Sequence, residues 1–153
     1  MAMSTLRRSD TVVVLHAEDD PDHHFLAVRA FAAAGVIASF QHVTSGRELL
    51  DYIHREGVFA DRAYLPHPDV ILLDLNMPEL DGLGALKAIR EDHGYDDTPV
   101  IVFTSQTSPE ERQRVYESGA NAYLEKGQEF GRIAELVDML SCFWEGNWEG
   151  QVA

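Results

Sequence analysis

The chain has 153 residues, of which 45% are hydrophobic and 25% are charged, and these values are typical of one soluble globular domain. Its formal net charge of −14 argues against nucleic-acid binding through a broad basic surface and against docking on anionic membranes. A single cysteine, Cys142, excludes an intramolecular disulfide and favours a reducing cytosol.

Strands and helices alternate along the sequence after residues 1–10, which we expect to form a flexible lead. Runs of β-branched and aliphatic residues predict strands at 11–15, 36–43, 70–74, 100–104 and 122–124. Turn residues and apolar stripes predict helices at 21–35, from 46, from 83, at 109–119 and at about 129–144. In the first helix, the residues expected to face the core are Phe25, Leu26, Val28, Phe31 and Ala32.

This strict alternation predicts an α/β fold. We expect a doubly wound five-stranded parallel sheet of the flavodoxin-like type, with strand order 2-1-3-4-5. The sequence predicts one domain at 11–145, a tail at 146–153 and no output domain. Residues 57–68 predict a long loop or a short extra turn, for which a functional role and an inert insertion are both open.

Asp74 directly follows the apolar run 70–73. Four consecutive large aliphatic residues are typical of a strand that is buried on both faces of a parallel sheet. Ligands of such sheets bind outside the carboxyl ends of the strands. Asp74 is therefore predicted to belong to a functional site.

Polar residues end four of the five predicted strands. They are Glu18 and Asp19, Asp74, Thr104 and Ser105, and Lys126. If these strands are neighbours, the three carboxylates lie close together, and a hard cation such as Mg²⁺ relieves their repulsion. A carboxylate oxygen of Asp74 can act as a nucleophile that forms an acyl phosphate. The hydroxyl of Thr104 and the ammonium of Lys126 can then stabilise the phosphoryl group.

Each of these groups also has a simpler interpretation. The acids at 18–20 can cap a helix, Asp74 can cap a loop, Thr104 can belong to a strand-end turn, and Lys126 can be a solvated surface residue. The occurrence of one such group at each of four strand ends favours a common site.

Together these residues resemble the receiver domain of two-component response regulators, over about residues 11–144. The matching segments are Glu18-Asp19-Asp20-Pro21, Leu72 to Pro78 with Asp81-Gly82, Val102 to Ser105, and Ala122 to Lys126. The combination is specific to that family, although no single segment is.

The resemblance implies a signalling protein that accepts phosphate, and not a turnover enzyme. Asp74 is implied to accept a phosphoryl group from a sensor histidine kinase. Mg²⁺ is implied as the cofactor, with Glu18, Asp19, Asp74 and the backbone carbonyl of Asn76 as its ligands.

The resemblance also implies how the phosphoryl group is held and lost. Thr104 and Lys126 are expected to contact it, and Tyr123 is expected to change rotamer on activation. Asn76 and Gln106 stand where the family tunes dephosphorylation.

Two features depart from the usual receiver pattern. Gly127 follows the lysine where the family commonly has proline, and we expect a trans peptide bond there because a cis bond without proline costs about 3 kcal/mol. The added length at 57–68 is the other departure. With Ser141 to Trp144, these features resemble the single-domain regulators of bacterial phytochromes, which are cytoplasmic.

That narrower resemblance implies the partners. We expect a phytochrome-type histidine kinase, an unidentified downstream protein, and a homodimer through the fourth strand, the fifth strand and the last helix. No nucleic-acid or membrane partner is expected.

Two other functions compete with this one. A degenerate receiver that acts only as a binding module is disfavoured, because all the chemical positions are intact. An Mg²⁺-dependent phosphohydrolase is disfavoured because Asn76 stands where a second aspartate would act as acid or base. His23 and His24 are expected to be solvated residues of the first helical turn, with metal ligation as the alternative.

Overall fold

The computed structural model describes residues 11–61, 65–79, 81–105 and 108–126. Several predictions concern residues outside these ranges: the lead 1–10, Gln106, the peptide bond of Gly127, the last helix at 129–144 and the tail at 146–153. Within the described part of the chain, no helix is long and apolar enough to cross a membrane.

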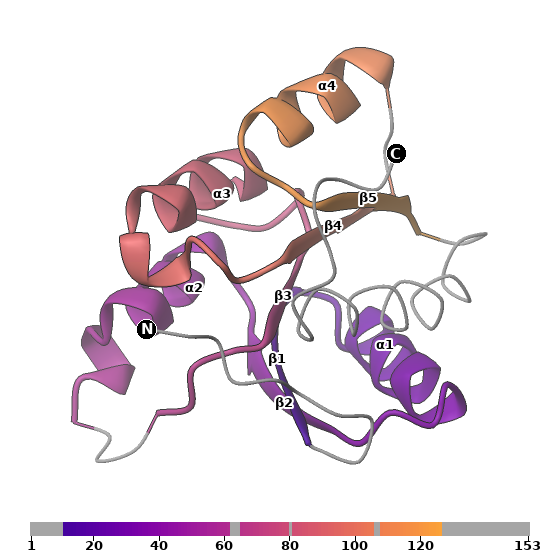
Figure 1. Ribbon diagram of the computed structural model, residues 1–153, viewed down its shortest axis with the longest axis vertical. Coiled ribbons are helices and arrows are strands. Elements are labelled where there is room, and N and C mark those ends of the chain that lie inside the picture. Colours follow the sequence, from indigo (N-terminus) through magenta and orange to yellow (C-terminus); the bar gives the residue numbers. More distant parts are fainter. Residues whose placement is uncertain (1–10, 62–64, 80, 106–107, 127–153) are drawn as a thin grey trace.

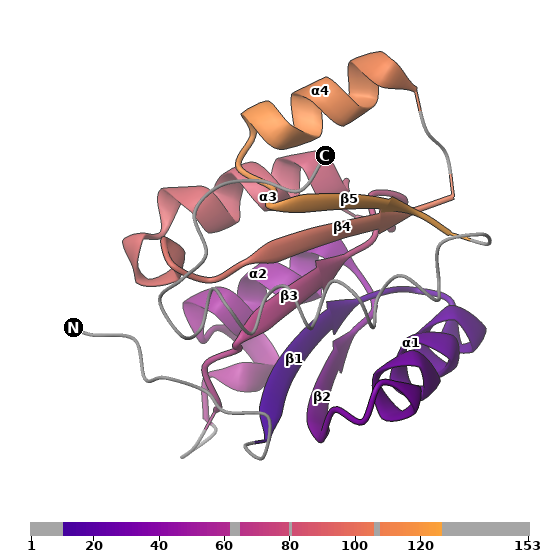
Figure 2. The same cartoon turned by 45° about the vertical axis from the view of Figure 1, so that its right-hand side comes forward.

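Five parallel strands form one sheet in the order β2-β1-β3-β4-β5. Their bounds are Val12–Ala17 (β1), Ala38–Val43 (β2), Val70–Leu73 (β3), Val100–Thr104 (β4) and Ala122–Glu125 (β5). Figures 1 and 2 show the strands side by side with helices around them. The predicted doubly wound α/β fold and its strand order are confirmed.

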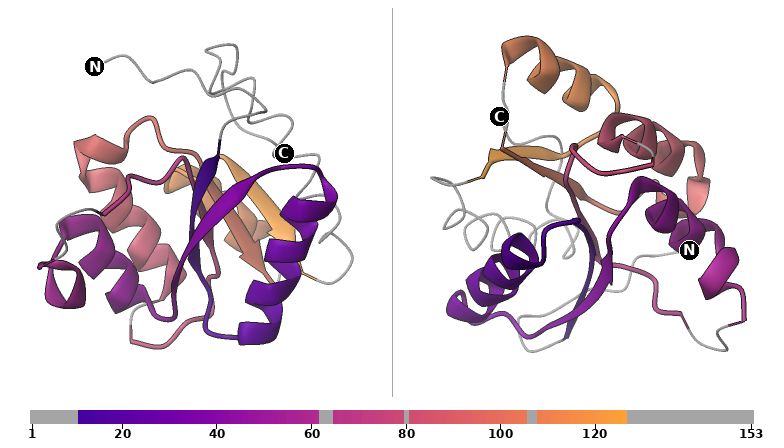
Figure 3. Two further views of the ribbon diagram at one scale, coloured as in Figure 1. Left: turned by 90° about the horizontal axis from the view of Figure 1, so that it is seen from below. Right: turned by 180° about the vertical axis from the view of Figure 1, so that it is seen from behind.

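Helices cover both faces of the sheet, as Figure 3 shows. They are α1 (Pro21–Ala33), α2 (Gly46–His54), α3 (Gly82–Glu91) and α4 (Pro109–Glu117), with short 3-10 turns η1 (Gly57–Phe59) and η2 (His93–Tyr95). One hydrophobic cluster packs α2, α3 and Val115 of α4 against one face. A second cluster packs α1 against the opposite face.

The central strand β3 contributes to both clusters. Ile71 and Leu73 belong to the cluster under α2 and α3, whereas Val70 and Leu72 belong to the cluster under α1. All four side chains are buried because successive residues of a strand point to opposite faces. This burial explains the continuous apolar run that precedes Asp74.

The predicted inner face of α1 is partly wrong. Ala27 and Phe31 are buried, whereas Phe25 is 59% exposed, Leu26 is 45% exposed and Ala32 is also exposed. The helix carries apolar residues on most of its circumference, so the sequence pattern does not determine which face is inside. The packing of the Phe31 ring edge-on against Phe40, with 5.3 Å between ring centroids, accompanies the observed orientation.

The helices that follow β1 and β3 begin at aspartate caps. Asp20 accepts a hydrogen bond from the backbone N–H of Asp22 at 2.8 Å, and Asp81 accepts one from Gly84 at 2.7 Å. Pro21 lies in the first turn of α1, where its missing N–H costs nothing. These caps fix the starts of α1 and α3 beside the carboxyl ends of β1 and β3.

The described residues of segment 57–68 pack against α2. Phe59 is buried with its ring 5.1 Å from that of Tyr52, centroid to centroid. The Tyr52 hydroxyl donates a hydrogen bond to the carbonyl of Pro66 at 2.6 Å. The short turn η1 therefore belongs to the fold at this end of α2.

Candidate functional site

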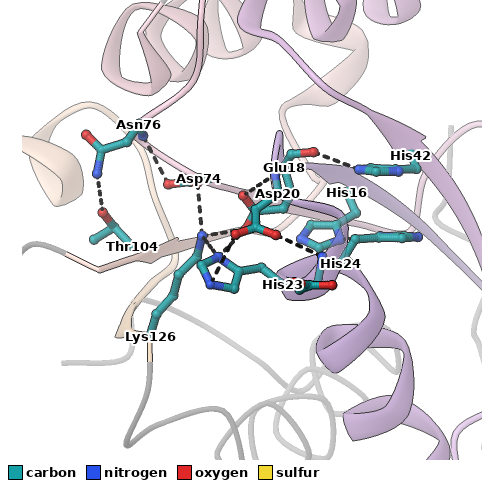
Figure 4. A network of polar contacts seen from close by, with 11 residues as sticks. His16, Glu18, Asp20, His23, His24, His42, Asp74, Asn76, Thr104 and Lys126 are labelled. Atoms are coloured by element: carbon teal, nitrogen blue, oxygen red, sulfur yellow. Dashed lines mark hydrogen bonds and ion pairs between the residues drawn. The ribbon is translucent and has the colours of Figure 1, made fainter.

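Three carboxylates meet at the carboxyl edge of the sheet. Glu18 follows β1 and Asp74 follows β3, and these neighbouring strands pair up to Ala17 and Leu73. Each of Glu18, Asp19 and Asp74 offers an oxygen, and these oxygens all lie within 4.8 Å of one another. Glu18 and Asp74 are buried, whereas Asp19 is exposed. Figure 4 shows Glu18 and Asp74 facing the same point.

Lys126 brings a positive charge to the carboxylates. Its backbone N–H donates to the carbonyl of Thr104 at 2.7 Å, which sets the residue at the end of β5. Its ammonium donates to Asp74 Oδ2 at 3.0 Å and to the Glu18 carboxylate. The lysine side chain is only 6% exposed. One buried ammonium therefore faces two buried carboxylates.

The balance of charge at this edge is negative. Burial raises the pKa of Glu18 to about 8, with a further rise from its hydrogen bond and charge contact with Asp74, while Lys126 opposes the rise. A single ammonium, that of Lys126, faces the buried carboxylates of Glu18 and Asp74, so it does not offset all of the negative charge. Three hard oxygen donors with an exposed member fit a divalent cation.

Asn76 links Asp74 to Thr104. The backbone N–H of Asn76 donates to Asp74 Oδ1 at 3.0 Å, and its side-chain amide donates to Thr104 Oγ1 at 3.3 Å. Thr104 is fully buried at the end of β4. Figure 4 shows Asn76 and Thr104 on the side of Asp74 away from Glu18. Asp74 is thus flanked by a hydroxyl, an amide and an ammonium.

Gly82 permits α3 to begin against the backbone of the Asp74 segment. A Cβ atom at Gly82 would lie 2.4 Å from Leu75 Cα and 2.6 Å from the Asp74 carbonyl oxygen. Only glycine allows this approach without a shift of the chain. This close approach explains why glycine follows Asp81 in the sequence.

Tyr123 belongs to β5, and its side chain packs against α4. Its ring is 3% exposed, its hydroxyl donates to Glu111 Oε1 at 3.2 Å, and the Arg112 guanidinium lies 4.9 Å from the ring centroid. Burial raises the pKa of Tyr123, and the Glu111 carboxylate raises it further. The side chain is therefore held inward by residues of α4. Gln106 lies outside the described residues.

His23 was expected to be a solvated helix residue, and that expectation is only partly right, because its side chain is 36% exposed in α1 but also contacts Lys126. Its Nδ1 accepts a hydrogen bond from the Lys126 ammonium at 3.0 Å. Pro21 starts the helix two residues earlier and brings His23 into the first turn, beside the carboxylates. Its place shortly after the acids at 18–20 was the signal in the sequence for a position near the site. The contact with Lys126 joins residues 103 apart, so the sequence around His23 does not predict it.

His24 was also expected to be solvated, and it is half-buried within a cluster of three histidines. Its ring stacks on that of His42 at 3.8 Å, and its Nδ1 lies 2.8 Å from His16 Nδ1. His42 Nε2 donates to the Glu18 carbonyl at 2.7 Å and so supports the loop after β1. Burial lowers the pKa of His16 well below its ordinary value, and the neighbouring imidazoles lower it further.

The comparisons with known proteins agree with this geometry. A model of the response regulator receiver domain matches residues 14–138. The probable methanogenesis regulatory protein FilR2 of Methanothrix harundinacea is 31% identical over 142 residues, which are 92% of this chain and 88% of the relative. The range 14–138 includes every described residue of the site.

Two solved structures share the fold over nearly their whole length. The response regulator RPA3017 in red light signalling of R. palustris is 33% identical, with a TM-score of 0.75 over 93% of this chain and 99% of that one. The phosphorylated cyanobacterial phytochrome response regulator RcpA is 26% identical, with a TM-score of 0.74 over 94% and 100%.

Proposed function

The chain belongs to the family of response regulator receiver domains, and on that basis we propose that it is a signalling switch that stores a phosphoryl group on Asp74. The convergence of Glu18, Asp19 and Asp74 with the ammonium of Lys126 is the observation that carries the proposal. The donor of the group is the phosphohistidine of a sensor histidine kinase.

The transfer is a displacement at phosphorus. A carboxylate oxygen of Asp74 attacks, a P–O bond forms, and the P–N bond to the kinase imidazole breaks with its electron pair returning to nitrogen. The Lys126 ammonium, 3.0 Å from Asp74 Oδ2, is positioned to balance the charge that gathers on the phosphoryl oxygens. Thr104 supplies a hydroxyl to the same oxygens.

Mg²⁺ is the proposed cofactor. Glu18, Asp19, Asp74 and the backbone carbonyl of Asn76 would hold it, and the three carboxylates provide the hard oxygen donors that it requires. A cation bound there would neutralise charge on the phosphoryl group. Burial and Asp74 raise the pKa of Glu18 despite its contact with Lys126, and a cation bound there would stabilise the ionised carboxylate.

Tyr123 is the proposed switch residue. Its inward position depends on Glu111 and Arg112, so a rearrangement at Thr104 on phosphorylation would compete with contacts to α4. Asn76, together with Gln106, is proposed to tune the slow loss of the phosphoryl group. Asn76 carries an amide that cannot act as a general base, which supports storage and not turnover.

The proposed kinase is of the phytochrome type. Support comes from the likeness to RcpA and RPA3017, whose names link them to phytochrome and to red light signalling. We further propose a cytoplasmic homodimer through β4, β5 and the last helix, and output by contact with a downstream protein.

Phosphorylation in vitro tests the proposal. The protein is incubated with Mg²⁺ and acetyl phosphate and examined by intact-mass spectrometry, with Asp74→Asn as the test variant and the exposed Asp97→Asn as the matched control. One acid-labile phosphate on the wild type and on Asp97→Asn, and none on Asp74→Asn, is expected. No phosphate on the wild type contradicts the switch, and phosphate release over many turnovers indicates a phosphohydrolase.

A further inference from the structure

Among the described residues the Lys126 ammonium has three hydrogen-bond partners, as many as it has N–H bonds. These acceptors are the Glu18 carboxylate, Asp74 Oδ2 at 3.0 Å and His23 Nδ1 at 3.0 Å. Figure 4 shows Lys126 reaching up between His23 and Asp74. The lysine side chain is 6% exposed and that of His23 is 36% exposed. His23 therefore lies on the solvent side of the buried ammonium.

The proposed reaction affects the contacts of the three partners with the ammonium differently. Glu18 and Asp74 are carboxylates of the proposed cation site, and Asp74 itself becomes the acyl phosphate. Their contacts with the ammonium must therefore weaken as the cation and the phosphoryl group arrive. His23 takes part in neither event, so it alone of the three can keep its hydrogen bond to Lys126 throughout.

The tautomer of His23 follows from the same contact. An ammonium has no acceptor, so His23 Nδ1 must offer its lone pair, and the ring proton must lie on Nε2. The Asp20 carboxylate lies 3.6 Å from that Nε2 atom and the Glu18 carboxylate lies 3.7 Å from Nδ1, so the contact with the ammonium decides the tautomer. Asp20 is itself fixed as the cap of α1.

We propose that His23 is a positioning residue for Lys126: it accepts a hydrogen bond from the ammonium and keeps it beside Asp74 while the phosphoryl group is transferred. This inference rests on the proposed function. His23 belongs to α1 and is neither a proposed ligand of Mg²⁺ nor a proposed contact of the phosphoryl group.

Two substitutions at position 23 distinguish a hydrogen-bond acceptor for Lys126 from a side chain that only fills space. His23→Asn keeps an acceptor close to the place of Nδ1, whereas His23→Leu has a similar bulk and no acceptor. We expect His23→Leu to lower the initial rate of phosphorylation by acetyl phosphate and Mg²⁺ by roughly threefold to tenfold, the effect of one lost hydrogen bond of typical strength. His23→Asn should stay within about twofold of the wild type. His54→Leu, at an exposed histidine of α2, is the control.

A double-mutant cycle tests whether His23 acts through the lysine. In a Lys126→Met background, His23→Leu should cause no further loss of rate, because the group that it positions is gone. Equal losses in His23→Leu and His23→Asn overturn the proposal. A loss from His23→Leu that persists in Lys126→Met also overturns it.

Nitrogen-15 NMR of the imidazole gives a readout that does not depend on phosphorylation. At mildly alkaline pH, His23 should be in the Nε2–H tautomer in the wild type and should move toward a mixture of tautomers in Lys126→Met. A wild-type ring protonated on Nδ1 contradicts the inference. Absence of phosphate on wild-type Asp74 contradicts the proposed function instead, whereas normal phosphorylation without the pattern above contradicts only the task of His23.

Discussion

Lys126 Nζ lies 3.0 Å from Asp74 Oδ2, and the two side chains, both at most 6% exposed, form a buried ion pair at the carboxyl edge of the sheet. The same ammonium also contacts Glu18. Because a buried charge is costly without a partner, this lysine stabilises the two carboxylates whenever no metal cation is bound.

Removal of the lysine charge should therefore destabilise the metal-free protein. We expect Lys126→Met to lower the free energy of unfolding by about 2–3 kcal/mol, less than the full cost of an orphaned buried charge because Glu18 can take up a proton. Urea unfolding monitored by circular dichroism measures this. The exposed Lys87→Met is the matched control and should change the free energy by less than about 0.5 kcal/mol.

Mg²⁺ should restore most of the stability that Lys126→Met loses, since a cation bound to the carboxylates replaces the missing charge and stabilises the folded state by mass action. If saturating Mg²⁺ stabilised the wild type and failed to stabilise the variant, this would contradict the hypothesis that Mg²⁺ and the lysine ammonium contact the same carboxylates.

The carboxyl group of Glu18 should make metal-free stability depend on pH. Its pKa is raised from an ordinary value of 4.5 to about 8, first by burial and then by Asp74. Between these values the folded protein holds a proton that the unfolded chain has lost. This contribution to stability is complete below pH 4.5 and is lost as the pH rises through about 8.

The difference between wild type and Glu18→Gln isolates this effect. His16 has a pKa lowered by burial, so it opposes Glu18 by reducing stability as the pH falls below 6.5, and its contribution cancels in the difference. The free energy of unfolding of the wild type should fall relative to Glu18→Gln as the pH rises, and saturating Mg²⁺ should flatten that trend. The exposed Glu91→Gln should follow the wild type. A constant difference across the range would exclude a raised pKa at Glu18.

Gly82 should tolerate no side chain. In Gly82→Ala the new Cβ would meet Leu75 Cα at 2.4 Å and the Asp74 carbonyl at 2.6 Å, and both atoms belong to the backbone. We expect a loss of about 1–3 kcal/mol in the free energy of unfolding and weaker Mg²⁺ binding, because relief of the clash moves the Asp74 segment.

Gly94→Ala is the comparison for that variant. Its Cβ would meet only the side-chain oxygen of Asp92 at 3.2 Å, which can move, so the change should be within about 0.5 kcal/mol. Calorimetric titration with Mg²⁺ and urea unfolding measure both variants. Equal stability of the two alanine variants would show that the backbone approach at Gly82 is not tight.

The order of the strands followed from local patterns in the sequence, and the details of packing did not. The aliphatic run 70–73 indicated a buried strand, and the polar residue after it indicated the edge that carries the site. The first strand extends to Ala17, beyond its predicted end at Leu15, because His16 is buried and has a partner in His24. Such a partner comes from another element, so a polar residue inside a strand cannot be recognised locally.

The same limit applies to the residues around Lys126. Glu18, Asp19, Asp74 and Lys126 could be grouped because each follows a strand, and parallel strands end at one edge. His23 lies on a helix, and its part in the site depends on a contact with a residue 103 positions away. The buried face of α1 likewise includes a contact between Phe31 and Phe40 of another element, which the apolar pattern of the helix does not reveal.

Glu111 should stabilise the inward position of Tyr123. The Tyr123 hydroxyl donates to Glu111 Oε1 at 3.2 Å, and a hydrogen bond of this kind contributes about 0.5–1.5 kcal/mol. Glu111→Ala should therefore raise the outward population of the tyrosine by roughly twofold to tenfold before any phosphorylation. Fluorine NMR of the protein with 3-fluorotyrosine measures the two populations, with Tyr123→Phe assigning the signal.

Glu110→Ala is the control: it removes the neighbouring acid from the same first turn of α4 and should leave the populations unchanged. Beryllofluoride with Mg²⁺ should move the signals of wild type and Glu111→Ala to the same position, because the outward state is the end point for both. An inward population in Glu111→Ala equal to that in Glu110→Ala would contradict a stabilising role for Glu111.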